Sequence, residues 1–223
     1  MPISDMNWVF NEKPLNHDHV KDIFEIKEYY HRINLRFWWW VYPRGQSSET
    51  KRILQDAGLY LFAKVPCLAA TLNESLLDDN PTDDIKILQV RSHEDLLNWK
   101  NVSFDGFEMP ACAREQYDAF ISSFTLDDQS PQKLFMAYLD EKPVATSLLF
   151  THKGTAGIYY VSTLPPYRNR GCGLKITQAA MQSAKQSGYV EVVLQATPLG
   201  VRVYQRAGFQ EYCQAEIYKL KAS

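Results

Sequence analysis

The stretch Tyr167-Arg168-Asn169-Arg170-Gly171-Cys172-Gly173-Leu174 joins a predicted strand, residues 156–163, to a predicted helix, residues 174–186. The first turn of such a helix has backbone N–H groups without partners in the helix, and the helix dipole adds partial positive charge there. The glycines allow the backbone to approach a ligand closely, and the arginines add charged donors. The stretch is therefore typical of an anion-binding loop, although R-x-x-G-x-G alone also fits an ordinary glycine turn.

A second motif, Tyr204-Gln205-Arg206-Ala207-Gly208-Phe209, fits the pattern Y-x-x-x-G-F. It is expected at the end of a short helix that follows a strand over 189–196, with Gly208 as the C-terminal cap. Alone it also fits a capped helix with a core tyrosine. Two other phosphate-binding patterns are excluded, because Ile176 stands where G-x-G-x-x-G needs its third glycine and no G-x-x-x-x-G-K-[ST] occurs.

Composition limits the class of protein. The chain has 223 residues, of which 45% are hydrophobic and 22% charged, as in an ordinary soluble globular protein. A net charge of −2 gives no basic footprint for nucleic acid, and the longest apolar run, 37–42, is too short to span a membrane. No signal peptide is evident at the N-terminus, and the 4 cysteines include no C-x-x-C pair and no His/Cys cluster. We therefore expect a reduced, cytoplasmic protein without a metal.

The order of predicted elements gives the fold class. A strand over 85–90 precedes two helices, the first capped by Ser92 and the second over 113–124. Three antiparallel strands should follow and lead into a strand–helix–strand unit that ends in the apolar strand 190–194. The predicted strands of the antiparallel part are 133–139, 143–151 and 157–163. The sequence thus predicts an α/β fold.

In this order and at this spacing, the two motifs resemble the GNAT superfamily of acyl-CoA-dependent N-acetyltransferases, over roughly residues 85–220. The resemblance implies the GNAT fold, a mixed and mostly antiparallel sheet flanked by helices. It also implies acetyl-CoA as the acyl donor and direct transfer of the acetyl group to an amine. In that family the strand before the R-x-x-G-x-G loop and the strand after the helix that follows this loop splay apart. The pantetheine arm of the cofactor lies in the gap much as an added strand would.

The resemblance also implies site residues. Tyr204 would protonate the leaving thiolate, and Thr197 stands where many relatives have an asparagine that binds the pantetheine arm. Gly200 replaces a more usual alanine. The implied cofactor contacts are the backbone of Val161, Ser162 and Thr163 for the pantetheine arm, and the N–H groups of Arg168, Asn169, Arg170, Gly171, Cys172, Gly173 and Leu174 for the pyrophosphate. The general base stays open between His93, Asp105, Glu108, His152, Ser162 and a chain of water molecules.

The domain organisation predicted from the sequence has three parts. Residues 77–84 form a polar, acidic linker between a smaller N-terminal half, 1–76, and the acetyltransferase domain, 85–223. The N-terminal half repeats the order helix–strand–helix–Gly–strand, and residues 52–59 align with 202–209. It has no R-x-x-G-x-G, and Leu54 stands where Tyr204 does, so we interpret it as a degenerate GNAT-like half that holds no cofactor in this way. The alternating Trp38, Trp39 and Trp40 should place some rings in a core.

These expectations lead to an N-acetyltransferase with a small-molecule or peptide amine as acceptor, without nucleic acid or membrane as partner. The acceptor, the acyl group preferred and the oligomeric state stay open. The alternatives are a non-catalytic acyl-CoA-binding or regulatory protein on the same scaffold, and an interaction module that uses the aromatic N-terminal half.

Overall fold

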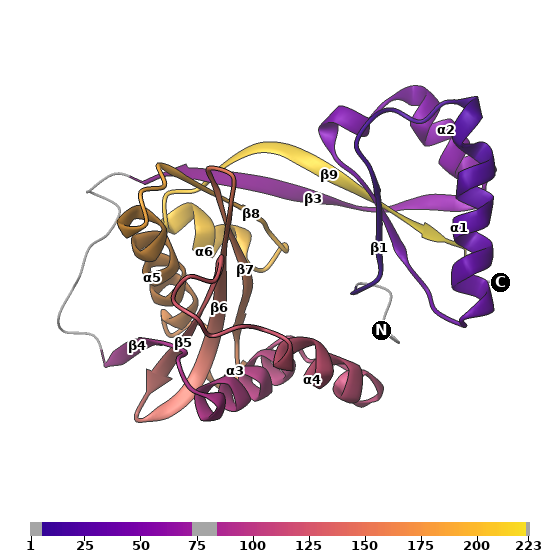
Figure 1. The fold of residues 1–223 in the computed structure, drawn as a ribbon. Helices are drawn as coiled ribbons and strands as arrows, with labels where there is room; N and C mark the ends of the chain where they lie inside the picture. The colour runs from indigo at the N-terminus through magenta and orange to yellow at the C-terminus, as the bar shows by residue number, and fades with distance from the viewer. Residues whose placement is uncertain (1–5, 73–83, 222–223) are drawn as a thin grey trace. The chain divides into compact units, whose positions relative to one another are not determined.

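The computed structural model describes residues 6–72 and 84–221 (Figure 1). Among these residues, short 3-10 turns lie at 17–19, 43–45, 111–113 and 165–167. The helices and strands are, in chain order, β1 (Trp8–Asn11), α1 (Val20–Arg32), β2 (Trp38–Val41), α2 (Ser48–Asp56), β3 (Leu59–Thr71), β4 (Ile85–Gln89), α3 (His93–Gly106), α4 (Arg114–Ser122), β5 (Gln132–Leu139), β6 (Lys142–His152), β7 (Thr155–Thr163), α5 (Cys172–Gln186), β8 (Glu191–Gln195), α6 (Val201–Arg206) and β9 (Gln210–Leu220).

The chain divides into two compact units. One holds Met1–Cys67 and Cys213–Ser223, and the other holds Leu68–Tyr212. Strands β3 and β9 therefore contribute residues to both units. Of the predicted linker 77–84, only Asp84 lies within the described residues. The predicted division into 1–76, 77–84 and 85–223 stays a prediction.

The sheet of the second unit has the order β3-β8-β7-β6-β5-β4. Strands β4 to β7 pair antiparallel in sequence, and β7 pairs parallel with β8, as predicted. The β7–β8 ladder covers only Ala156↔Val192 and Gly157↔Val193. Since β7 continues to Thr163, its second half lies beyond the part that pairs with β8.

Helices cover both faces of this sheet (Figure 1). Successive side chains of β6 point to opposite faces. The Ser147 hydroxyl donates to the backbone oxygen of Ile176 in α5, whereas the neighbouring Thr146 meets Ser162, which in turn lies against Gly106 of α3. Helix α5 therefore packs on one face and α3 on the other, with the largest apolar cluster between the sheet and α5.

Local signals explain most of these elements. Ser92 caps α3 by accepting a hydrogen bond from the Asp95 backbone N–H, as predicted. Strands β5 and β6 are joined at Asp140 and Glu141, whose φ angles of 51° and 58° are those of a tight type I′ hairpin turn.

The first unit has the strand order β1-β2-β9-β3, with α1 and α2 on one face. Trp39 is buried in the core beneath these helices, which confirms that part of the tryptophan alternation. Trp38 and Trp40 lie on the opposite face, beside Trp8 and Phe62, at ring separations of 5.8–6.4 Å. Strand β1, parallel to β2, was not predicted from the sequence.

The two copies of the proposed internal repeat share one backbone feature. The order α1, β2, α2, Gly58, β3 matches the order α5, β8, α6, Gly208, β9. Gly58 and Gly208 both adopt the left-handed conformation, with φ of 85° and 90°. This conformation favours glycine and ends each helix. The descent of the first unit from a GNAT-like half stays a prediction.

Candidate active site

The loop over residues 164–171 turns sharply before α5. Residues Pro165–Tyr167 form a 3-10 turn, Asn169 has a φ of 62°, and Gly171 has a φ of 87° directly before the first residue of the helix. Left-handed residues at these positions turn backbone N–H groups in one direction and make an anion-binding concavity. The predicted donors from Arg168 to Leu174 lie in this loop and in the first turn of α5, which begins at Cys172, and their role in binding stays a prediction.

Three elements meet at Gly173. A Cβ atom placed on Gly173 would lie 3.7 Å from Val203 Cγ1 in α6 and 3.8 Å from Thr163 Oγ1 at the end of β7. The first turn of α5, the half of β7 that does not pair with β8 and the helix that carries Tyr204 are thus neighbours. A strand edge beside a helix N-terminus fits a ligand with a phosphate group and an extended amide arm, such as a coenzyme A thioester.

Tyr204 is 8% exposed and packs edge-on against Phe209, with ring centroids 5.9 Å apart. Burial raises the pKa of its hydroxyl to about 12. None of the hydrogen bonds among the described residues involves this hydroxyl. The side chain therefore keeps its proton at neutral pH and has that proton free to donate.

Gly200 lies close to both Tyr204 and Thr197. A Cβ atom on Gly200 would lie 2.7 Å from Tyr204 Cε2, so a larger residue would have to move the ring. This close approach gives a physical reason for glycine in place of alanine. The Thr197 hydroxyl accepts a hydrogen bond from the Gly200 N–H at 3.3 Å, which leaves its own proton available.

Strand β7 carries a bulge in its second half. Thr146 pairs with Ser162 and Leu148 with Tyr159, so β7 has one residue more than β6 between these pairs. Tyr160 has a φ of 51°, which is rare for an aromatic residue. Its ring lies among Trp99, Phe107, Phe120 and Phe124, with centroids 5.7–6.5 Å away, and burial raises its pKa to about 12.

A chain of hydroxyl groups holds this bulge. Thr146 Oγ1 lies 2.9 Å from the Tyr160 backbone oxygen and 2.8 Å from Ser162 Oγ. Because a backbone oxygen only accepts, Thr146 must donate to Tyr160, and Ser162 must then donate to Thr146. Both hydroxyl groups are buried. Sequence reasoning missed Thr146 and the conformation of Tyr160, and no residue in this segment signals a left-handed position.

The two arginines of the loop differ in their surroundings. Arg168 Nε donates to the Thr163 backbone oxygen, and its Nη2 donates to the Gly106 backbone oxygen and to Glu108 Oε2. Arg170 is exposed, and its guanidinium lies 5.8 Å from the centre of the Tyr167 ring. Cys172 is buried in the apolar cluster beneath α5.

The residues considered as general base are dispersed. His93 begins α3, whereas Asp105 and Glu108 lie at its other end, about 20 Å away at the rise of an α-helix. His152 pairs with Thr155, at the opposite end of β7 from Ser162. Glu108 pairs with Arg168, and the Ser162 proton is directed to Thr146. None of these side chains is identified as a free base at the site.

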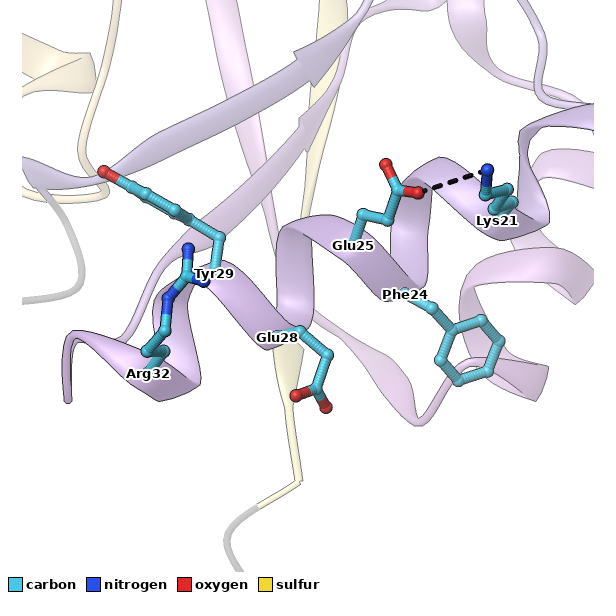
Figure 2. Close-up of a pocket in the computed structure, with 6 residues that line it drawn as sticks. All are labelled: Lys21, Phe24, Glu25, Glu28, Tyr29 and Arg32. Atoms are coloured by element: carbon cyan, nitrogen blue, oxygen red, sulfur yellow. Dashed lines mark ion pairs between the residues drawn. The ribbon is translucent and has the colours of Figure 1, made fainter.

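Other surfaces give weaker signals. A hollow along α1 is lined by charged and aromatic side chains, with Lys21 and Glu25 3.5 Å apart (Figure 2). All of its lining residues come from one helix, which is typical of a solvated helix face. Within 6–72 and 84–221, no group of three His, Cys, Asp or Glu side chains is arranged to hold a metal ion. Over the same residues, none of the helices has the length and apolar character to cross a membrane.

Comparison with known proteins identifies the class. The family model described as "Acetyltransferase (GNAT) family" matches residues 93–209, which is more than half of the chain. This range contains both α3 and the Tyr204 helix. The chain belongs to the GNAT acetyltransferase family, and its mixed sheet flanked by helices is the GNAT fold, as the sequence predicted. No curated protein matches the sequence.

Solved structures agree on the fold. A GCN5-related N-acetyltransferase from Kribbella flavida has a TM-score of 0.74 and 20% identity, covering 95% of this chain and 79% of its own. A GCN5-related N-acetyltransferase from Sphaerobacter thermophilus has a TM-score of 0.64 and 19% identity, covering 92% and 68%. A GCN5-related glucosamine N-acetyltransferase region of a fungal β-N-acetylglucosaminidase has a TM-score of 0.60 and 13% identity, covering 82% and 25%.

Proposed function

We propose that this protein is an N-acetyltransferase that uses acetyl-CoA as donor and transfers the acetyl group directly to an amine. The observation that supports it best is the meeting of three features at Gly173. These are a helix N-terminus preceded by a left-handed glycine, the half of β7 that does not pair with β8, and the helix with the protonated Tyr204. Membership of the GNAT family supports the same reaction class.

In this proposal the chain's own residues have distinct tasks. The backbone of Val161, Ser162 and Thr163 would align the pantetheine arm, and the N–H groups from Asn169 to Leu174 would bind the pyrophosphate, whereas the Arg168 N–H is engaged by the Pro165 backbone oxygen. The phosphate-binding residues would thus be Asn169, Arg170, Gly171, Cys172, Gly173 and Leu174. Thr197 would donate its hydroxyl proton to the pantetheine arm. Bound acetyl-CoA would supply an activated acyl group on a thioester.

Tyr204 would act as the general acid. Its hydroxyl is protonated at neutral pH, as any tyrosine with a pKa of 10.0 or above is, and Oη would donate that proton to the thiolate as it leaves. An amine acceptor must lose a proton before it attacks, because an amine with a pKa near ~10 is mostly charged at neutral pH. Since Glu108 and Ser162 are engaged by Arg168 and Thr146, ordered water is the acceptor for that proton in our proposal.

Two measurements, made one after the other, test the proposed function. Acetyl-CoA at 100 times its dissociation constant should add about 2.7 kcal/mol to the stability of the protein that binds it, visible as a rise in the unfolding temperature. Turnover is then measured by thiol release with a panel of amines that includes glucosamine, because one structural relative is described as a glucosamine N-acetyltransferase region. Absence of any rise at millimolar acetyl-CoA would refute the cofactor site.

A second candidate is a non-catalytic acyl-CoA-binding protein on the same scaffold. The engagement of Glu108 and Ser162 by other residues favours it, because an enzyme needs a route for the amine proton. Tight binding of acetyl-CoA without thiol release for any amine in the panel would favour this candidate. Thiol release that depends on both an amine and Tyr204 would exclude it.

A further inference from the structure

The Arg168 guanidinium spans two segments that are far apart in sequence. Its Nε–H donates to the Thr163 backbone oxygen at 3.2 Å, at the end of β7. Its Nη2 donates to the Gly106 backbone oxygen and to Glu108 Oε2, both at 2.9 Å, at the end of α3. The N–H groups on Nη1 have no part in these contacts. One side chain thus connects the loop before α5 with the last turn of α3.

The backbone around these contacts is held closely. A Cβ atom on Gly106 would lie 2.8 Å from Ser162 Oγ and 3.3 Å from the Thr163 backbone nitrogen, so only glycine permits this approach of α3 to β7. Glu108 has a φ of 52°, in the left-handed region that costs a non-glycine residue about 1–2 kcal/mol. The ion pair with Arg168 helps to compensate for that cost.

We propose that Arg168 is a positioning residue that couples the loop before α5 to the last turn of α3, with Gly106 and Glu108 as its anchors. The proposal deepens the proposed function and rests on it for its meaning in catalysis. The turn after α3 carries Phe107, whose ring lies edge-on to Tyr160 at 6.1 Å. A ligand on the loop would therefore be sensed at the aromatic cluster around the β7 bulge.

The weak ion pair with Glu108 and the forked shape of the arginine side chain explain how Arg168 can contact both segments. The pair with Glu108 is exposed on both sides, with side chains 36% and 65% accessible, so it is weak and can adjust. Arginine presents its donors in a rigid fork, whereas lysine is a point charge. Lysine at this position would keep the charge near the loop and lose the simultaneous contacts with Thr163, Gly106 and Glu108.

Hydrogen exchange of the ligand-free protein tests the coupling without relying on activity. The amides of Phe107, Glu108 and Met109 donate to backbone oxygens of α3, so their exchange reports on this turn. The amides of Tyr167 and Arg168 donate to Leu164 and Pro165 and report on the loop. We expect Glu108→Ala to speed exchange about fivefold at both segments, which corresponds to about 1 kcal/mol for an exposed ion pair.

Two further variants sharpen the test. Glu108→Gln keeps an acceptor of the same reach and should restore part of the protection, whereas Glu115→Ala removes an exposed carboxylate from the first turn of α4 and should change neither segment. In combination with Arg168→Lys, Glu108→Ala should add little, because Arg168→Lys already removes the contact with Glu108. The coupling would be overturned if exchange in Glu108→Ala became faster at 107–109 alone or stayed unchanged at both segments. It would also be overturned if Glu115→Ala had the same effect as Glu108→Ala.

Calorimetry with CoA on the wild-type protein separates this inference from the proposed function. If CoA does not bind, the proposed function fails, while the exchange result still decides whether Arg168 couples the two segments. If CoA binds, it should slow exchange at 107–109 in the wild type and less so in Glu108→Ala. Bound CoA without any effect at 107–109 in the wild type would overturn the coupling.

Discussion

The substitution Thr146→Val should destabilise the second unit by about 3 kcal/mol. Valine matches the shape of threonine but lacks the hydroxyl that donates to the Tyr160 backbone oxygen and accepts from Ser162. Thr146 is fully buried and Ser162 is 5% exposed, so both former partners would be left unsatisfied. An unsatisfied buried polar group costs about 1–3 kcal/mol, and Ser162 can rotate to recover part of its loss.

This loss of stability is measured by thermal and urea unfolding, with a probe that reports on the second unit. A loss of about 3 kcal/mol lowers the unfolding temperature by about 6–12 °C for a unit of this size. Thr146→Ser restores the hydroxyl and should recover most of the stability, apart from the deleted methyl group. A loss below about 1 kcal/mol for Thr146→Val, or equal losses for the two variants, would refute the hydroxyl chain as the support of the left-handed Tyr160.

Three further predictions concern the site. Tyr204→Phe should lower turnover by about 10²–10⁴-fold, with acetyl-CoA affinity from calorimetry unchanged, because only the proton donor is removed; an unchanged rate would exclude Tyr204 as the acid. Burial raises the pKa of Tyr204 from 10.0 to about 12, so folded protein holds a proton that unfolded protein releases between these values, and stability falls as pH rises from 10 to 12. The free energy of unfolding, measured with urea, should therefore fall less between pH 10 and pH 12 for Tyr204→Phe than for the wild type. Parallel plots of this free energy against pH for the two proteins would contradict this reasoning. Gly171→Ala and Gly154→Ala replace left-handed glycines with φ of 87° and 83°, and each should lower the free energy of unfolding by about 1–2 kcal/mol. Only Gly171→Ala should also weaken acetyl-CoA binding. Equal acetyl-CoA affinities of the two variants would argue against the loop as a phosphate site.

The fold was largely predictable because its local signals agree with one another. Apolar runs, helix caps and turn residues give the strands and helices of the second unit to within a few residues, and Ser92 and Gly208 act as the caps that the sequence indicates. Strand β1 was not predictable, because Trp8–Asn11 is short and its parallel pairing with β2 depends on residues thirty positions away.

The site was predictable only in part, because its contacts join distant segments. The left-handed Gly171 and the burial of Tyr204 follow from the motifs. Two of the three partners of Arg168, Glu108 and Gly106, lie 60 and 62 residues earlier, and no local pattern predicts them. The conformation of Tyr160 goes against the preference of an aromatic residue, so propensity alone gives the wrong backbone there. The cofactor contacts at Val161, Ser162, Thr163 and Thr197 stay predictions.

The uneven distribution of tryptophan gives this protein built-in optical probes. Of the 5 tryptophans, Trp8, Trp38, Trp39 and Trp40 belong to the first unit, and Trp99 alone belongs to the second. Trp99 is fully buried, with its indole N–H shared between the backbone oxygens of Phe135 and Ser147. In a Trp99→Phe variant all indole fluorescence comes from the first unit, and the difference from the wild type isolates the second. The two melting curves, recorded on an unlabelled chain, then show whether a coenzyme stabilises one unit or both.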